Sequence, residues 1–203
     1  MAAHEGDRRF AAIWHLAWVV AACVMGGVMA WQGAPAPGPE FAALGSIGAA
    51  ALFGAVAAAT GGGTAGVLAI LVWAIAGAAA CSLTGGIVGP FAIWCLTPLA
   101  AGAAFGRPRL LALGAAAGVG AAAVAALASV LLVLPKPADG LSIWFSLLAL
   151  GTTGMGVAAG LVAFQGQVRG DLGRWRETEL DLRETLERQS LLLLTLYPGG
   201  RII

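Results

Sequence analysis

The chain has 203 residues, of which 60% are hydrophobic and only 10% charged, with a mean hydropathy of +0.89 and a net charge of +1. Soluble domains carry about 25% charged residues, so this composition excludes an ordinary soluble protein and indicates one that faces lipid. A net charge so close to zero gives no electrostatic reason to expect binding to nucleic acid. We therefore expect the lipid bilayer, and no nucleic acid, as a partner.

The charges are distributed very unevenly along the chain. Residues 10–164 contain few formal charges, and acidic and basic residues become frequent from residue 165 onward. This layout is typical of a membrane domain that is joined to a cytoplasmic output segment. The predicted parts are a cytoplasmic N-terminus (1–9), a transmembrane domain (10–164), a juxtamembrane hinge and signalling helix (165–190) and the start of a further domain (191–203).

Six apolar stretches have about the 20 residues that a membrane-spanning helix requires. Clusters of proline and glycine separate most of them, because neither residue type readily continues a helix. Pro98 lies inside the fourth stretch and should kink that helix, and Gly85 and Gly86 form the least defined boundary. The fold predicted is an all-α, polytopic bundle. Its six predicted transmembrane helices are 10–31, 41–60, 65–83, 87–105, 110–134 and 141–164.

Arginines in the short loops predict the orientation, because lysine and arginine are enriched on the cytoplasmic side of membranes. With six spans, all arginine clusters fall on one side and Lys136 falls on the other, so both termini are predicted to be cytoplasmic. Five or seven spans would put one cluster on the wrong side. The predicted topology anchors are Arg8, Arg9, Arg107, Arg109, Arg169, Arg174 and Arg176.

The first stretch has one alternative interpretation. The residues that end at Cys23 loosely match a lipoprotein signal, in which the cysteine would become lipidated after cleavage. The apolar run continues to Trp31, which favours a membrane span. The three cysteines of the chain all lie in apolar runs and do not indicate a disulfide framework. We interpret Cys23, Cys81 and Cys95 as small packing residues.

Ionisable side chains are almost missing from the predicted spans. Transporters, pumps and membrane enzymes usually keep such groups within the bilayer. His15 is the one candidate, either as a ligand, haem or proton site or as a hydrated histidine near the membrane surface. We favour the second interpretation, because no other predicted span contains a histidine. The serines in the spans have no base at depth, so the sequence predicts no catalytic, cofactor-binding or metal-binding residue in this chain.

The segment after the sixth span combines flexible and helix-forming residues. Its three closely spaced glycines each weaken a helix by about 1 kcal/mol relative to alanine, which suggests a hinge. A heptad seam follows at Val168, Leu172, Trp175, Glu179, Leu182, Leu186, Gln189 and Leu193. The seam favours a dimeric stalk, with a solvated single helix as the alternative. The predicted signal-relay residues are Gly166, Gly170, Gly173, Leu172, Trp175, Leu182 and Leu186.

The C-terminal residues have the pattern of a hairpin. Leu191–Leu196 is predicted as a strand, residues 197–200 as a turn rich in proline and glycine, and residues 201–203 as the beginning of a return strand. The run Gly199-Gly200-Arg201-Ile202 resembles the first turn of a PAS domain, which commonly reads Asp-Gly-Arg-Ile. We therefore expect these residues to be the first strands of a truncated PAS-like domain.

A multi-span N-terminal region, a stalk and a PAS-like start together resemble a bacterial sensor histidine kinase. The resemblance implies an inner-membrane homodimer that phosphorylates a response regulator. It also implies ATP and Mg²⁺ in a kinase domain outside this chain, with no cofactor in the chain itself. The alternatives are the sensor region of a diguanylate cyclase, a six-helix transporter or channel for an apolar solute, and a structural anchor without a sensory role.

Overall fold

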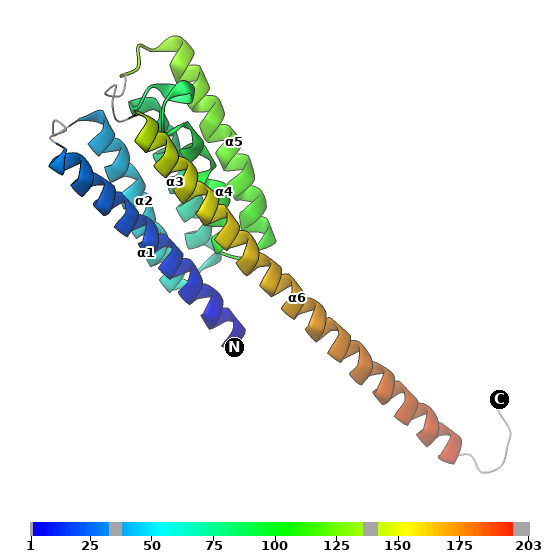
Figure 1. Ribbon diagram of the computed structural model, residues 1–203. Helices are drawn as coiled ribbons and strands as arrows, with labels where there is room; N and C mark the ends of the chain where they lie inside the picture. The colour runs from blue at the N-terminus through cyan, green and yellow to red at the C-terminus, as the bar shows by residue number, and fades with distance from the viewer. Residues whose placement is uncertain (1, 33–37, 136–141, 197–203) are drawn as a thin grey trace. The chain divides into compact units, whose positions relative to one another are not determined.

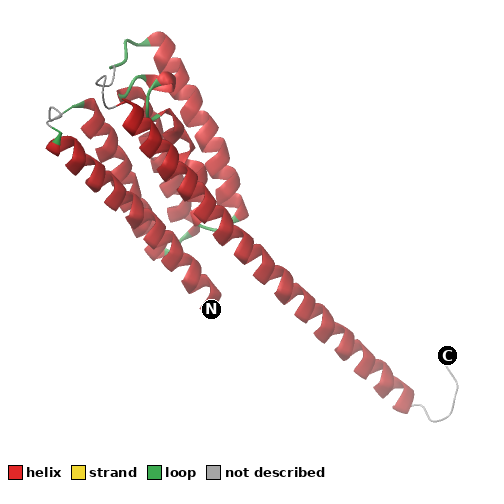
Figure 2. Ribbon diagram, in the orientation of Figure 1, coloured by secondary structure: helices red, strands yellow, loops and turns green. Residues whose placement is uncertain are grey.

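The structure is a computed structural model that describes residues 2–32, 38–135 and 142–196. Every regular element in these ranges is helical, with no strand among the described residues (Figure 2). The all-α prediction is therefore confirmed for the described part of the chain. High alanine and leucine content explains the preference, because both residues are strong helix formers.

The chain divides into two compact units, Met1–Phe164 and Gln165–Ile203. In the first unit, α1 and α2 lie side by side, as do α2 and α3 (Figure 1). The last helix, α6, begins in the first unit and provides the described part of the second. The helices are α1 (Ala2–Trp31), α2 (Pro39–Thr60), α3 (Gly63–Leu83), η1 (Gly86–Val88), η2 (Ala92–Leu96), α4 (Thr97–Ala104), α5 (Pro108–Leu131) and α6 (Ser142–Leu196).

Five of the described helical segments are long and apolar enough to cross a membrane. Their outer surfaces carry large apolar side chains, such as Ile75 at 71% exposure and Val130 at 82%. Such surfaces fit lipid, because in water they would expose a large apolar area. The five segments are Arg8–Trp31, Pro39–Thr60, Gly63–Leu83, Pro108–Leu131 and Phe145–Val162. They correspond to all the predicted spans except the fourth.

The predicted fourth span is not one kinked helix. Two short 3₁₀ turns, η1 and η2, precede the eight-residue helix α4. Pro98 lies in the first turn of α4, where its missing N–H and restricted φ are well tolerated, so it does not kink a longer helix. Gly85 and Gly86 both have left-handed φ angles, of 102° and 73°, and turn the chain after α3. The prolines and glycines have broken this segment rather than bent it.

The segment from η1 to the end of α4, residues 86–104, is called the broken segment below, and it lies along the length of α5. Near one end, the backbone N–H of Ile87 donates to Ser129 Oγ over 3.1 Å. Near the other end, Gly102 packs against the backbone of Leu110 and Leu111. Between these ends, Gly114 of α5 contacts the backbone around Pro98. The broken segment and α5 therefore run antiparallel, and glycine lets their backbones approach closely.

The strand predicted over residues 191–196 is wrong, because α6 continues as a helix to Leu196. Four consecutive leucines lie in this stretch, and leucine is among the better helix formers, whereas strands favour β-branched and aromatic residues. The predicted turn and return strand, residues 197–203, lie outside the described residues. The resemblance to a PAS domain therefore stays a prediction.

Candidate functional site

Four buried tryptophans join three elements in the core of the first unit. Trp14 and Trp18 belong to α1, Trp73 to α3 and Trp94 to η2, and each is at most 6% exposed. The ring centroids of Trp18 lie 5.3 Å from those of Trp73 and 6.4 Å from those of Trp94. Phe91 stacks on Trp94 with centroids 4.0 Å apart. Aromatic pairs add about 0.5–1.5 kcal/mol beyond their burial, so this cluster holds the broken segment against α1 and α3.

His15 lies in the same core, and the prediction that it stays hydrated near the surface is wrong. Its side chain is 0% exposed, and its Nδ1 lies 2.7 Å from the carbonyl oxygen of Ala11. A carbonyl only accepts, so Nδ1 carries the proton and Nε2 is left as an acceptor, with no hydrogen-bond partner among the described residues. The imidazole fits because α2 presents Gly54, where any Cβ would overlap the ring. This contact between helices cannot be seen in the sequence.

His15 is not placed as a metal ligand. Among the described residues, no group of three or more histidine, cysteine, aspartate or glutamate side chains could hold a metal ion. The neighbours of the imidazole are aromatic, with Trp14 and Phe105 at centroid distances of 4.9 and 5.2 Å. His15 therefore acts in this structure as a packing residue between α1 and α2.

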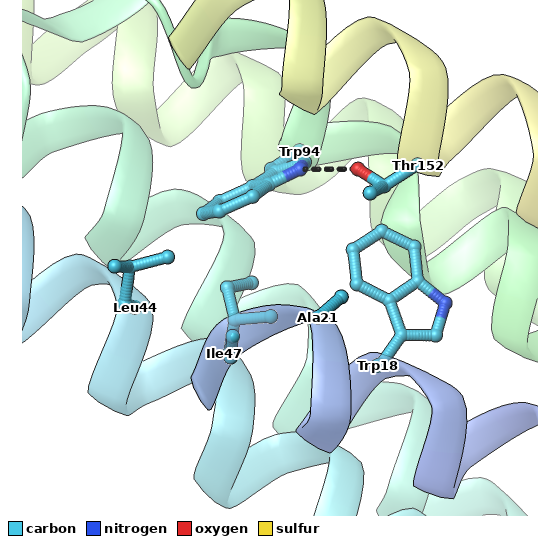
Figure 3. A pocket seen from close by; sticks show the side chains of 7 residues that line it. Trp18, Ala21, Leu44, Ile47, Trp94 and Thr152 are labelled. Carbon is cyan, nitrogen blue, oxygen red and sulfur yellow. Dashed lines mark hydrogen bonds between the residues drawn. The ribbon is translucent and has the colours of Figure 1, made fainter. Parts of the chain in front are cut away.

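Two indole N–H groups of the cluster reach α6. Trp94 Nε1 donates to Thr152 Oγ1 over 3.4 Å (Figure 3). Trp14 Nε1 donates to the carbonyl oxygen of Gly156 over 3.3 Å. Beside the first bond lies a small apolar pocket of about 10 Å³. Its lining residues are Trp18, Ala21, Ala22, Leu44, Ile47, Trp94 and Thr152. The cluster thus connects the broken segment to the helix that leaves the first unit.

The three predicted hinge glycines all lie inside α6 and do not interrupt it. A Cβ added at Gly166, Gly170 or Gly173 would meet no atom within 4 Å. No neighbouring side chain therefore requires glycine at these positions. What the glycines contribute is a lower helix stability over this stretch, because each loses more backbone entropy on helix formation than alanine does.

The predicted seam residues lie on one helix and are exposed. Leu172, Trp175, Leu182 and Leu186 have exposed fractions between 58% and 75%. Their spacings of three and four residues bring them to one side of α6. On the same side, Glu179 Oε1 accepts a hydrogen bond from Arg183 Nη2 over 2.8 Å. The helix thus presents a stripe of largely exposed apolar side chains.

Two of the predicted topology anchors meet at one turn. The Arg8 guanidinium lies against Gly61, the left-handed residue that ends α2 with a φ of 68°. Arg107 Nη1 lies 3.8 Å from the position that a Cβ of Gly63 would take. Arg8 and Arg107 therefore lie at the same end of the bundle. Arg9, Arg109, Arg169 and Arg176 are exposed, and the side chain of Arg174 lies outside the described residues.

The chain is similar to the histidine protein kinase DivJ of Caulobacter vibrioides. The two sequences are 37% identical over 150 residues, which make up 73% of this chain and 25% of DivJ. The chain thus matches about a quarter of the length of that relative. No family model matches the chain, and no solved structure matches it. The predicted resemblance to a histidine kinase is confirmed by this similarity.

Proposed function

We propose that this chain is the membrane-anchoring and sensory input region of a sensor histidine kinase, and that it passes its signal through a dimeric α6 stalk. The observation that carries the proposal is the similarity to DivJ over 150 residues, in a chain whose helices can cross a membrane. A kinase domain outside the chain would bind ATP and Mg²⁺ and act on a response regulator. The protein would then reside in a bacterial inner membrane.

The proposal includes six crossings, with the broken segment as the fourth. Support comes from its antiparallel contacts with α5, which extend from Ser129 to Leu110. The 24 residues of α5 rise about 36 Å, enough for a hydrocarbon core of about 30 Å. A segment that lies along this length traverses a similar depth. With an even number of crossings, both termini lie on the same side of the membrane as Arg8 and Arg107. Because arginine is enriched on the cytoplasmic side, we propose that this side is cytoplasmic.

Labelling of single cysteines tests this topology. In a variant whose native cysteines are replaced by alanine, Val88→Cys and Pro108→Cys place one thiol at each end of the broken segment, where both native residues are exposed. A membrane-impermeant maleimide should label Val88→Cys in intact spheroplasts and Pro108→Cys only in inverted vesicles. Labelling of both positions from the same side would contradict six crossings.

Stiffening α6 tests the relay. Replacing Gly166, Gly170 and Gly173 together by alanine should stabilise this stretch of helix by about 3 kcal/mol, at about 1 kcal/mol for each residue. Because the added methyl groups meet no neighbour, insertion into the membrane should be unchanged. The rate of autophosphorylation of the kinase that carries this chain should change. Gly154→Ala is the matched control, since it lies in the apolar part of α6 and also meets nothing within 4 Å. Equal rates for all three proteins would refute the hinge.

A further inference from the structure

Two of the three cysteines come together in the structure. Cys81 of α3 is 0% exposed and Cys95 of η2 is 3% exposed, and they form one buried cluster with Ala121 and Ala125 of α5. Both cysteines are free. The third cysteine, Cys23, is exposed on α1. The sequence predicts all three as small packing residues, and the fold brings two of them together in one buried cluster.

The backbones around this pair are unusually close. Gly77 lies one helical turn before Cys81, on the same side of α3, and a Cβ at Gly77 would overlap the carbonyl oxygen of Trp94. On the other side of η2, a Cβ at Gly118 of α5 would lie 3.1 Å from the carbonyl oxygen of Cys95. Because cysteine side chains are short, a disulfide needs such a close backbone approach.

We propose that Cys81 and Cys95 are a reversible dithiol–disulfide pair that a lipid-soluble quinone oxidises. The residues around the cluster are small and only partly buried, which leaves a thin cover between the thiols and lipid. They are Ala74, Ala78, Ala92 and Ala122. An apolar oxidant dissolves in the bilayer and reaches this cover, whereas a polar oxidant pays a desolvation penalty to enter it.

The reaction balances with the quinone as its one co-reactant. The S–H bonds of Cys81 and Cys95 break and one S–S bond forms between their sulfur atoms. The two electrons and two protons pass to the carbonyl oxygens of the quinone, which becomes a quinol. The reverse reaction, or exchange with an external dithiol, restores both thiols.

The disulfide would act on the helix that leaves the first unit. It would link α3 to η2 at the residue next to Trp94, whose indole N–H donates to Thr152 of α6. A change in the position of η2 is therefore passed to α6 through this bond and the packing around it. The effect on α6 rests on the proposed function, whereas formation of the disulfide does not depend on it.

Counting thiols in the purified 203-residue chain, reconstituted in lipid nanodiscs, tests the pair. After treatment with oxidised decylubiquinone and denaturation, the number of maleimide-reactive thiols should fall from three to one, and peptide mass spectrometry should show a link between Cys81 and Cys95. The Cys23→Ser variant should lose both of its thiols in the same way. The Cys81→Ser variant should retain its two thiols.

Three reactive thiols after quinone treatment would overturn the proposal. Linkage by hydrogen peroxide but not by decylubiquinone would overturn the assignment of the oxidant. The thiol count needs no kinase, so its failure leaves the proposed function standing. The opposite result is also distinguishable. If the disulfide forms but the alanine substitutions in α6 leave autophosphorylation unchanged, the relay is refuted and the thiol pair is not.

Discussion

Replacing Gly114 by alanine should destabilise the membrane domain by about 2 kcal/mol. A Cβ at this position would overlap the carbonyl oxygen of Pro98 and lie 3.2 Å from Leu99 Cα. Both atoms belong to the backbone, so no side chain can rotate to make room. The broken segment would have to move away from α5, and the buried contacts of α4 would loosen. Overpacking of this kind costs roughly 1–3 kcal/mol.

Gly120 provides the matched control, because it lies in the same helix and a Cβ there meets nothing within 4 Å. Alanine at that position should stabilise α5 by about 0.5–1 kcal/mol through its higher helix propensity. Unfolding of the purified protein by SDS in mild detergent, followed by tryptophan fluorescence, measures both changes. If the two variants unfold at the same SDS fraction, the close contact between the broken segment and α5 is absent.

The positions of most membrane spans could be predicted, because hydropathy is a property of each local stretch of sequence and needs no knowledge of tertiary contacts. The ends of the second and third spans, Thr60 and Leu83, match the structure, since glycine-rich turns follow both helices. The form of the fourth span could not be predicted in this way. An apolar segment with two prolines is compatible with a kinked or a broken helix, and its contacts with α3 and α5 decide between the two.

The interior of the bundle was harder to predict than its spans. His15 is buried because Gly54 of α2 faces it, and Cys81 meets Cys95 because Gly77 admits the backbone of η2. Each contact joins residues of different elements, and a single sequence contains no signal for such pairs. The seam residues of α6 were easier to place on one helix, because seam spacing is a local property of the sequence.

The second large effect concerns the phase of α6, which is the direction around the helix axis in which its seam residues point. If two stalks pair through Leu172, Trp175, Leu182 and Leu186, the seam must stay on one side of the helix. Two alanines inserted after Glu177 rotate the following residues by about 200°, so the two halves of the seam face opposite sides. Duplicating residues 178–184 adds one heptad, which rotates them by about 700° and leaves the seam within 20° of its original direction.

The two insertions should therefore differ in output although both lengthen the stalk. Coupling between sites in proteins is typically 1–3 kcal/mol, which corresponds to at least about a fivefold change. We expect the two-residue insertion to alter autophosphorylation by that factor and the heptad duplication to leave it near the unmodified level. Insertion into the membrane should be the same in both proteins, since residues 10–164 are unchanged.

The most direct measurement of the relay is the autophosphorylation rate of a membrane-embedded hybrid in which this chain replaces the matching region of DivJ. The rate should depend on the phase of α6, with the heptad duplication close to the unmodified hybrid and the two-residue insertion at least about fivefold away from it. Equal rates for the two insertions would contradict a signal that leaves the membrane domain through α6.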